Sequence, residues 1–148
     1  RKGNCLSRFG FVMYIDENLY LTRSKKFKKV LSSTCLTETL AFIAALRETS
    51  HLLNLLKELK VQVKHVQFYC DNKSALDILT SEKMTDATKE LKICDLKVRR
   101  TFLKEKRFVA RYVCSKINIA DFFTKILPPN QFFEFRDKLV KKFTGLDH

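Results

Sequence analysis

The sequence has few residues that break regular structure and no apolar run long enough for a membrane span. Only 3 Gly and 2 Pro occur among 148 residues, and Trp is absent. This composition excludes collagen-like and low-complexity chains and favours regular helices and strands. No stretch approaches roughly 18 consecutive apolar residues, and residues 1–10 lack the apolar core of a secretory signal peptide. We therefore expect an intracellular protein without a membrane anchor.

The cysteines are not spaced as zinc ligands usually are. Cys5, Cys35, Cys70, Cys94 and Cys114 lie far apart, and none belongs to a CxxC pair or a Cys/His zinc motif. We interpret them as buried, reduced thiols of an intracellular protein.

Positive charge is the strongest bias of the composition. The chain carries 29 Lys and Arg against 16 Asp and Glu, a formal net charge of +13. This excess is larger than solubility requires and suits a polyanionic partner such as nucleic acid. A generically basic surface is the alternative explanation.

Hydrophobic patterning predicts alternating strands and helices along the whole chain. The predicted elements are a β-hairpin over 9–21, a long helix over 36–59, a strand over 63–70, a short helix over 74–79, a long helical stretch over 88–104, a strand over 108–113 and a last amphipathic helix over 130–143. The order β-β-α-β-α-α-β-α favours an α/β fold with helices on the faces of a central sheet. With 45% hydrophobic residues and no linker, residues 1–148 are expected to form a single domain.

Three carboxylates occupy positions suited to a metal site at a sheet edge. Glu38 is near the start of the long predicted helix, Asp71 follows a strand, and Asp121 begins a late helix. Ligands in open α/β sheets gather outside the carboxyl ends of strands, and Mg²⁺ prefers oxygen ligands. Each acid also has a structural explanation, as a helix cap or as a partner of a helix dipole.

Several local motifs resemble one family. Residues 70–75, CDNKSA, resemble the CDNxSA motif of the ribonuclease H domain in copia-type LTR retrotransposon Pol polyproteins, and residues 118–125, NIADFFTK, resemble its NIADxxTK motif. The weaker matches are Arg1-Lys2 through Val12 to RKSxSGYV, 31–34 to LSSTE, Thr88-Lys89 to TKH, and the helix start at Thr37-Glu38 to ribonucleases H in general. The resemblance covers nearly the whole chain.

The resemblance implies a ribonuclease H-like fold, in which helices flank a central mixed β-sheet. It implies that Glu38, Asp71 and Asp121 are catalytic metal ligands for two Mg²⁺ ions, with Mn²⁺ as an alternative. The implied reaction is endonucleolytic hydrolysis of the RNA strand of RNA–DNA hybrids during retrotransposon reverse transcription. A neighbouring reverse transcriptase domain is the implied partner, and the implied location is a cytoplasmic virus-like particle or the nucleus.

Polar and basic residues near these acids are candidate contacts to nucleic acid. Asn72 and Ser74 suit the minor groove of a hybrid, whose ribose hydroxyls and backbone are recognised by shape. Lys89, Lys92 and Arg99 lie on the second long helical stretch, where they suit phosphates. The alternative for the basic residues is a solvated helix face.

The family pattern is incomplete at one position. The family places its first catalytic Asp on a strand before the RKSxSGYV segment, and this sequence begins inside that segment, while Asp16 and Glu17 fall in a turn. A catalytically inactive, domesticated module that binds nucleic acid or a protein partner is therefore the main alternative.

The last predicted helix contains four phenylalanines: Phe132, Phe133, Phe135 and Phe143. Helical spacing predicts that most of them pack in the core, and an interface with a polymerase domain is the alternative.

Overall fold

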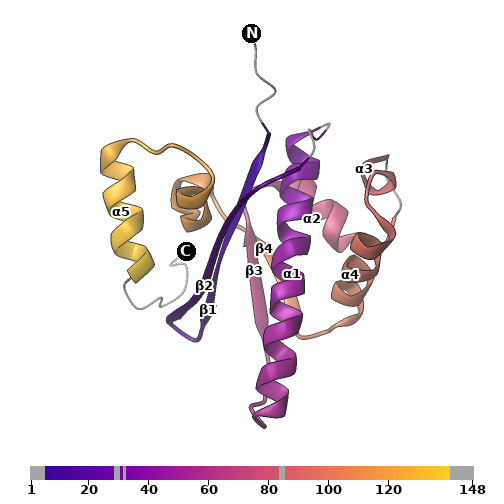
Figure 1. The fold of residues 1–148 in the computed structure, drawn as a ribbon. Helices are drawn as coiled ribbons and strands as arrows, with labels where there is room; N and C mark the ends of the chain where they lie inside the picture. Colours follow the sequence, from indigo (N-terminus) through magenta and orange to yellow (C-terminus); the bar gives the residue numbers. More distant parts are fainter. Residues whose placement is uncertain (1–5, 29–30, 32, 84–85, 141–148) are drawn as a thin grey trace. The chain divides into compact units, whose positions relative to one another are not determined.

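A computed structural model describes residues 6–28, 31, 33–83 and 86–140 (Figure 1). The chain divides into two compact units, which we call unit 1 (residues 1–30 and 115–148) and unit 2 (residues 31–114). The predictions that concern Arg1-Lys2, Cys5, Ser32 and residues 141–143, with Phe143, lie outside the described residues.

Unit 1 is built on a β-hairpin. Its elements are β1 (Arg8–Ile15), β2 (Asn18–Lys26), the 3₁₀ helices η1 (Ser115–Ile117) and η2 (Ile119–Phe123), and α5 (Pro129–Val140). β1 and β2 pair antiparallel, and Asp16 has a φ of 52° in the tight turn between them. Gly10 lets η2 approach β1, since a Cβ there would lie 2.8 Å from the Cβ of Phe123.

Unit 2 combines a parallel strand pair with helices that pack beside it (Figure 1). Its elements are α1 (Thr34–Glu58), β3 (Val66–Cys70), α2 (Lys73–Thr80), α3 (Asp86–Lys89), α4 (Ile93–Lys104) and β4 (Phe108–Tyr112). β3 and β4 run parallel, with Val66 opposite Phe108 and Cys70 opposite Tyr112. A parallel pair requires a crossover between its strands, and the segment with α2, α3 and α4 supplies it.

Aromatic rings form the centre of the unit 2 core. Phe42 of α1 contacts Phe68 of β3 and Phe102 of α4, with ring centroids 5.1 and 5.7 Å apart. Phe108 of β4 packs 5.5 Å from Phe68, centroid to centroid. Edge-to-face pairs of this kind stabilise a core beyond the area they bury. The rings therefore fix α1, α4 and the strand pair to one another.

The order of helices and strands confirms the sequence prediction, and the protein is mixed α/β. The single central sheet was not found: the described strands form two two-stranded sheets, β1-β2 and β3-β4. Each sheet belongs to a different unit, so the strands divide as the chain does. The strand predicted from residue 63 begins only at Val66.

The helical stretch predicted over 88–104 is two helices. α3 ends at Lys89 and α4 begins at Ile93. The carboxylate of Asp95 accepts a hydrogen bond of 3.3 Å from the backbone N–H of Lys92, which starts a new helix there. Leu91 lies in the segment that connects α3 to α4, and its side chain is buried in the core.

The prediction of core packing holds for one of the three described phenylalanines of α5. Phe135 is fully buried, whereas Phe132 and Phe133 are 41% and 51% exposed. The exposed rings contact other side chains instead. The ring centroids of Phe132 and Phe122 lie 4.8 Å apart, and the guanidinium of Arg136 lies 5.0 Å from the ring centroid of Phe133.

Among the described residues, no helix combines the length and the apolar character needed to cross a membrane.

Candidate metal-binding site

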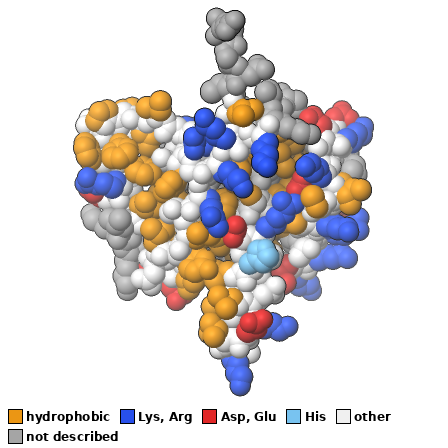
Figure 2. All heavy atoms as spheres, in the orientation of Figure 1, with side chains coloured by type: hydrophobic (Ala, Val, Ile, Leu, Met, Phe, Trp, Pro, Cys, Tyr) orange, Lys and Arg blue, Asp and Glu red, His pale blue; other side chains and the backbone are white. Residues whose placement is uncertain are grey.

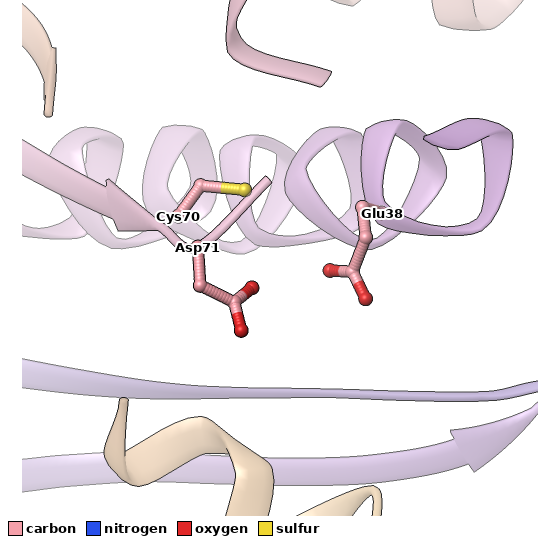
Figure 3. Close-up of side chains that lie close together, drawn as sticks. All are labelled: Glu38, Cys70 and Asp71. Atoms are coloured by element: carbon pink, nitrogen blue, oxygen red, sulfur yellow. The ribbon is translucent and has the colours of Figure 1, made fainter. Parts of the chain in front are cut away.

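Two of the three predicted acids of the metal site come together in unit 2. Glu38 lies one turn into α1, and Asp71 directly follows the last residue of β3. Ligand atoms of Glu38, Asp71 and Cys70 all lie within 4.8 Å of one another. Figure 3 shows the two carboxylates turned toward each other, with the sulfur of Cys70 pointing from the end of β3 toward α1. We call these three residues the Glu38–Cys70–Asp71 cluster.

The backbone around Asp71 is fixed on both sides. Before it, the N–H of Val113 donates to the carbonyl of Cys70 at 3.0 Å and extends the parallel pairing. After it, the side-chain oxygen of Asn72 accepts from the N–H of Ala75 at 3.0 Å and caps α2. Asp71 therefore lies in a two-residue connection, with Asn72, between β3 and α2.

Glu38 is positioned by the buried start of α1. The hydroxyl of Ser33 accepts from the N–H of Leu36 at 3.1 Å and caps the helix. Thr37 and Thr39 flank Glu38 in sequence and are both buried. Because these neighbours anchor this turn of α1 in the core, the Glu38 carboxylate extends from a rigid base to its half-buried position.

Cys70 belongs to the same cluster, although its spacing from the other cysteines did not predict a ligand role. Its side chain is 6% exposed, and the N–H of Asn72 donates to its sulfur at 3.5 Å. Burial, with smaller contributions from the charges of Glu38 and Asp71, raises the pKa of the thiol to about 11. Cys70 is therefore a neutral thiol at physiological pH. The one feature of the sequence that indicated a ligand role for Cys70 was its position immediately before Asp71.

Asp121, the third predicted acid, lies in η2 of unit 1. Its side chain is 8% exposed, and its carboxylate pairs with the ammonium of Lys125 at 2.7 Å. Asn118 caps η2 by accepting from the N–H of Ala120 at 3.2 Å. The NIADxxTK motif thus has a local structural role: it builds a capped 3₁₀ turn closed by an ion pair. The positions of units 1 and 2 relative to one another are not determined.

The predicted nucleic-acid contacts have varied surroundings. Ser74, Lys89 and Lys92 are exposed, and the ammonium of Lys89 pairs with Asp86 at 2.7 Å. Asn72 is half-buried, and its oxygen is engaged in capping α2. Ser74 and the two lysines are therefore accessible to a polyanion.

Arg99 has a different environment from the other basic candidates. It is 5% exposed, and its Nε donates to the carbonyl of Ile78 at 2.7 Å. The guanidinium also donates to the carbonyls of Ser81 and Lys83. These carbonyls lie at the end of α2 and in the following loop, so Arg99 ties that loop to α4. A guanidinium held in this way is a structural group, and we do not include Arg99 in a nucleic-acid surface.

Exposed basic side chains are nevertheless abundant. Figure 2 shows Lys and Arg side chains outnumbering acidic ones on the face in view. Unit 2 alone contributes exposed basic residues from several elements: Lys73, Lys92, Lys97, Arg100 and Arg111. These side chains present positive charge to solvent on the described part of unit 2.

Fold and site together define a mixed α/β protein with a basic surface and a cluster of potential metal ligands. The chain is 27% identical over 143 residues to the Retrovirus-related Pol polyprotein from transposon TNT 1-94 of Nicotiana tabacum, a match that covers 97% of this chain and 10% of that polyprotein. The chain therefore spans about a tenth of the length of this relative. The similarity supports a protein derived from a retrotransposon Pol polyprotein. No family model and no solved structure matches the chain.

Proposed function

We propose that the chain is a ribonuclease H domain that hydrolyses the RNA strand of RNA–DNA hybrids. The observation that carries the proposal is the meeting of Glu38 and Asp71, from separate elements, within 4.8 Å of each other. Both acids were selected from the sequence because they match metal ligands of that family. The similarity to a retrotransposon Pol polyprotein over 97% of the chain supports the same assignment.

The donor set fits a hard divalent cation. Mg²⁺ prefers carboxylate oxygens and keeps several waters, so two half-buried acids at a solvent-accessible edge are suitable ligands. Bound Mg²⁺ would supply an acidified water and charge stabilisation for the departing oxygen. Glu38 and Asp71 would hold the ions, two Mg²⁺ with Mn²⁺ as an alternative, and on the resemblance of its motif alone we assign Asp121 to the same ligand set.

The rest of the site would bind the substrate through its backbone. Asn72 follows Asp71 directly and Ser74 lies three residues after it, and both are candidates for ribose hydroxyl contacts in the minor groove. Lys89 and Lys92 are exposed and suit phosphates. A reverse transcriptase domain is the proposed neighbour, and a virus-like particle in the cytoplasm or the nucleus is the proposed location.

Cleavage of a labelled RNA–DNA hybrid with Mg²⁺ tests this function. Asp71→Asn and Glu38→Gln remove one ligand charge each and should lower the rate at least about 100-fold, on the order of 3 kcal/mol in activation free energy. The matched controls are Asp77→Asn and Glu58→Gln, which change exposed acids of α2 and of the far end of α1. Equal rates in the site variants and the controls would refute the proposal.

A nucleic-acid-binding module without hydrolysis is the second candidate. The observation that favours it is the ion pair of Asp121 with Lys125, which already compensates the charge of one proposed ligand. Both candidates require hybrid affinity that falls steeply with salt, because lysines that contact phosphates release counterions. Salt-sensitive binding with no Mg²⁺-dependent cleavage would select the binding module. Binding that is flat with salt would refute both candidates.

A further inference from the structure

The thiol in the Glu38–Cys70–Asp71 cluster has no use in a purely magnesium-binding site. Mg²⁺ takes oxygen ligands, whereas thiolates bind zinc and softer ions such as Cd²⁺. The cluster offers one sulfur and two carboxylate groups, and both kinds of donor atom occur in zinc sites. Its chemistry is thus mixed, and this distinguishes it from a site of oxygen donors only.

The separations within the cluster are close to those of a real coordination sphere. Zn–S bonds are about 2.3 Å and Zn–O bonds about 2.0–2.2 Å, so tetrahedral S and O ligands lie roughly 3.5 Å apart. The donor atoms here lie within 4.8 Å of one another without an ion. The remaining distance of roughly 1 Å is within the reach of a change of side-chain rotamer at Glu38 or Asp71.

The sulfur is also held in a defined place. Cys70 is 6% exposed and packs in the hydrophobic core cluster of unit 2, so its rotamer is restricted by packing. Figure 3 shows the sulfur directed toward α1 near Glu38, while the carboxylates approach from their own elements. A sulfur held by packing beside two carboxylates resembles a prearranged site, in which little entropy is lost on binding.

We propose that the Glu38–Cys70–Asp71 cluster binds a thiophilic divalent cation, Zn²⁺ or Cd²⁺, through the Cys70 sulfur and an oxygen of each acid, and that this cation competes with Mg²⁺. Binding forms a sulfur–metal bond and releases the thiol proton to water, with no change of oxidation state. The competition rests on the proposed function, because it requires that Mg²⁺ uses Glu38 and Asp71. The coordination through Cys70 does not depend on catalysis.

Cd²⁺ is the sharpest probe, since a Cd–thiolate bond gives an ultraviolet charge-transfer band that carboxylates do not give. In a Cd²⁺ titration of the whole chain, we expect a saturable band whose amplitude Cys70→Ser lowers, and the band that remains comes from the other thiols. Cys114→Ser is the matched control, because Cys114 lies just beyond β4, is exposed, and is not in a metal-ligand cluster of described residues. An amplitude at low Cd²⁺ that Cys70→Ser lowers no more than Cys114→Ser would overturn the proposal.

The acids have a separate signature in the same titration. Glu38→Gln and Asp71→Asn should keep the band at saturation but weaken Cd²⁺ affinity. Losing a hydrogen-bond partner of a metal ligand costs roughly 10–100-fold in affinity, and we expect the loss of a ligand to cost at least as much. Unchanged affinity in both variants would reduce the site to a lone thiol and refute the cluster. Circular dichroism establishes that each variant is folded.

Competition distinguishes this proposal from the nuclease. Added Mg²⁺ should weaken the apparent Cd²⁺ affinity of the unmodified chain, and an affinity independent of Mg²⁺ would overturn the shared-ligand claim. A Cys70-dependent band that Mg²⁺ weakens, in a chain that does not cleave the hybrid, would keep this site and refute the nuclease. Cleavage that depends on Glu38 and Asp71, in a chain without a Cys70-dependent band, would support the nuclease and refute the proposed Cd²⁺ site.

Discussion

The aromatic cluster of unit 2 and the ring pair Phe132 and Phe133 of unit 1 are buried to different extents, although unit 1 also buries Phe135 completely. In unit 2, Phe42, Phe68 and Phe102 meet in a closed core, and Phe68 and Phe102 are 9% and 5% exposed. In unit 1, Phe132 and Phe133 meet edge to face with ring centroids 5.7 Å apart, while 41% and 51% of their surface stays in solvent. Buried rings stabilise far more than exposed ones, because their apolar area is removed from water.

The same contrast applies to the predicted metal ligands. Glu38 and Asp71 extend from elements that the unit 2 core fixes, and they converge with Cys70. Asp121 is in a five-residue 3₁₀ helix of unit 1, where its charge meets Lys125. Unit 2 thus holds a preorganised pair of acids by itself, whereas the role of Asp121 depends on a local ion pair. The following variants test this difference, beginning with the largest expected effect.

Truncation of a core ring should separate the two units most clearly. Phe102→Ala leaves a cavity between Phe42 and Phe68 and should lower the free energy of unfolding by about 3–5 kcal/mol. Phe133→Ala in unit 1 should cost about 1 kcal/mol or less, the range of its cation–π contact with Arg136. Urea unfolding followed by circular dichroism measures both. Similar losses in the two variants would contradict the contrast.

The ion pair between α1 and α4 should give the next largest effect. Arg47 donates to the carboxylate of Asp95 at 2.5 Å, and Asp95 is 6% exposed. Asp95→Asn weakens this contact and the bond to the Lys92 N–H, so we expect a loss of about 1–3 kcal/mol in unfolding free energy.

The control for this pair is an exposed pair of the same unit. Asp86, whose side chain is 97% exposed, pairs with Lys89. Asp86→Asn should change the unfolding free energy by less than about 0.5 kcal/mol, because solvent screens exposed pairs. Equal effects of the two substitutions would mean that burial does not strengthen the Asp95 contact.

These buried ions show where sequence reasoning stopped. Basic residues on the second helical stretch were predicted to suit phosphates, with a solvated helix face as the alternative, yet Arg99 donates to carbonyls at the end of α2 and in the loop after it. Asp95, for which the sequence predicted no partner, pairs with Arg47 of α1. Their partners lie 21 and 48 residues away. A hydrophobic pattern predicts which helix face is apolar, but it carries no information about which distant partner a charged side chain meets.

Local features were predicted more completely. The long helix predicted over 36–59 is present, with Leu36, Ile43 and Leu46 buried, and the short helix predicted over 74–79 is capped by Asn72. Both depend on residues a few positions apart, where spacing decides the structure. Convergence of Glu38 with Asp71 followed from the family pattern, whereas the sulfur of Cys70 entered only with the side-chain geometry.

Removal of a helix cap should have an intermediate effect. Asn72→Ala leaves the N–H of Ala75 without its acceptor and should cost about 1 kcal/mol, whereas Asn72→Ser keeps a capping oxygen and should restore most of it. Asn118→Ala is the equivalent in unit 1, where the bond to the Ala120 N–H is longer, 3.2 Å against 3.0 Å. We expect a smaller loss there, measured by thermal unfolding. A larger loss of stability in Asn118→Ala than in Asn72→Ala would contradict the expectation that the cap in unit 2 contributes more.

Removal of the Lys125 charge should have the smallest effect on stability and the most informative effect on function. The Lys125 side chain is 54% exposed, so Lys125→Met should cost less than about 1 kcal/mol. If Asp121 is a metal ligand, the ammonium competes with Mg²⁺ for its carboxylate, and the variant should bind Mg²⁺ more tightly in calorimetry. Lys138→Met, which breaks an exposed pair with Glu134 in the same unit, is the control. Mg²⁺ affinity that changes in neither variant would assign Asp121 a purely structural role and leave the metal site to the ligands of unit 2.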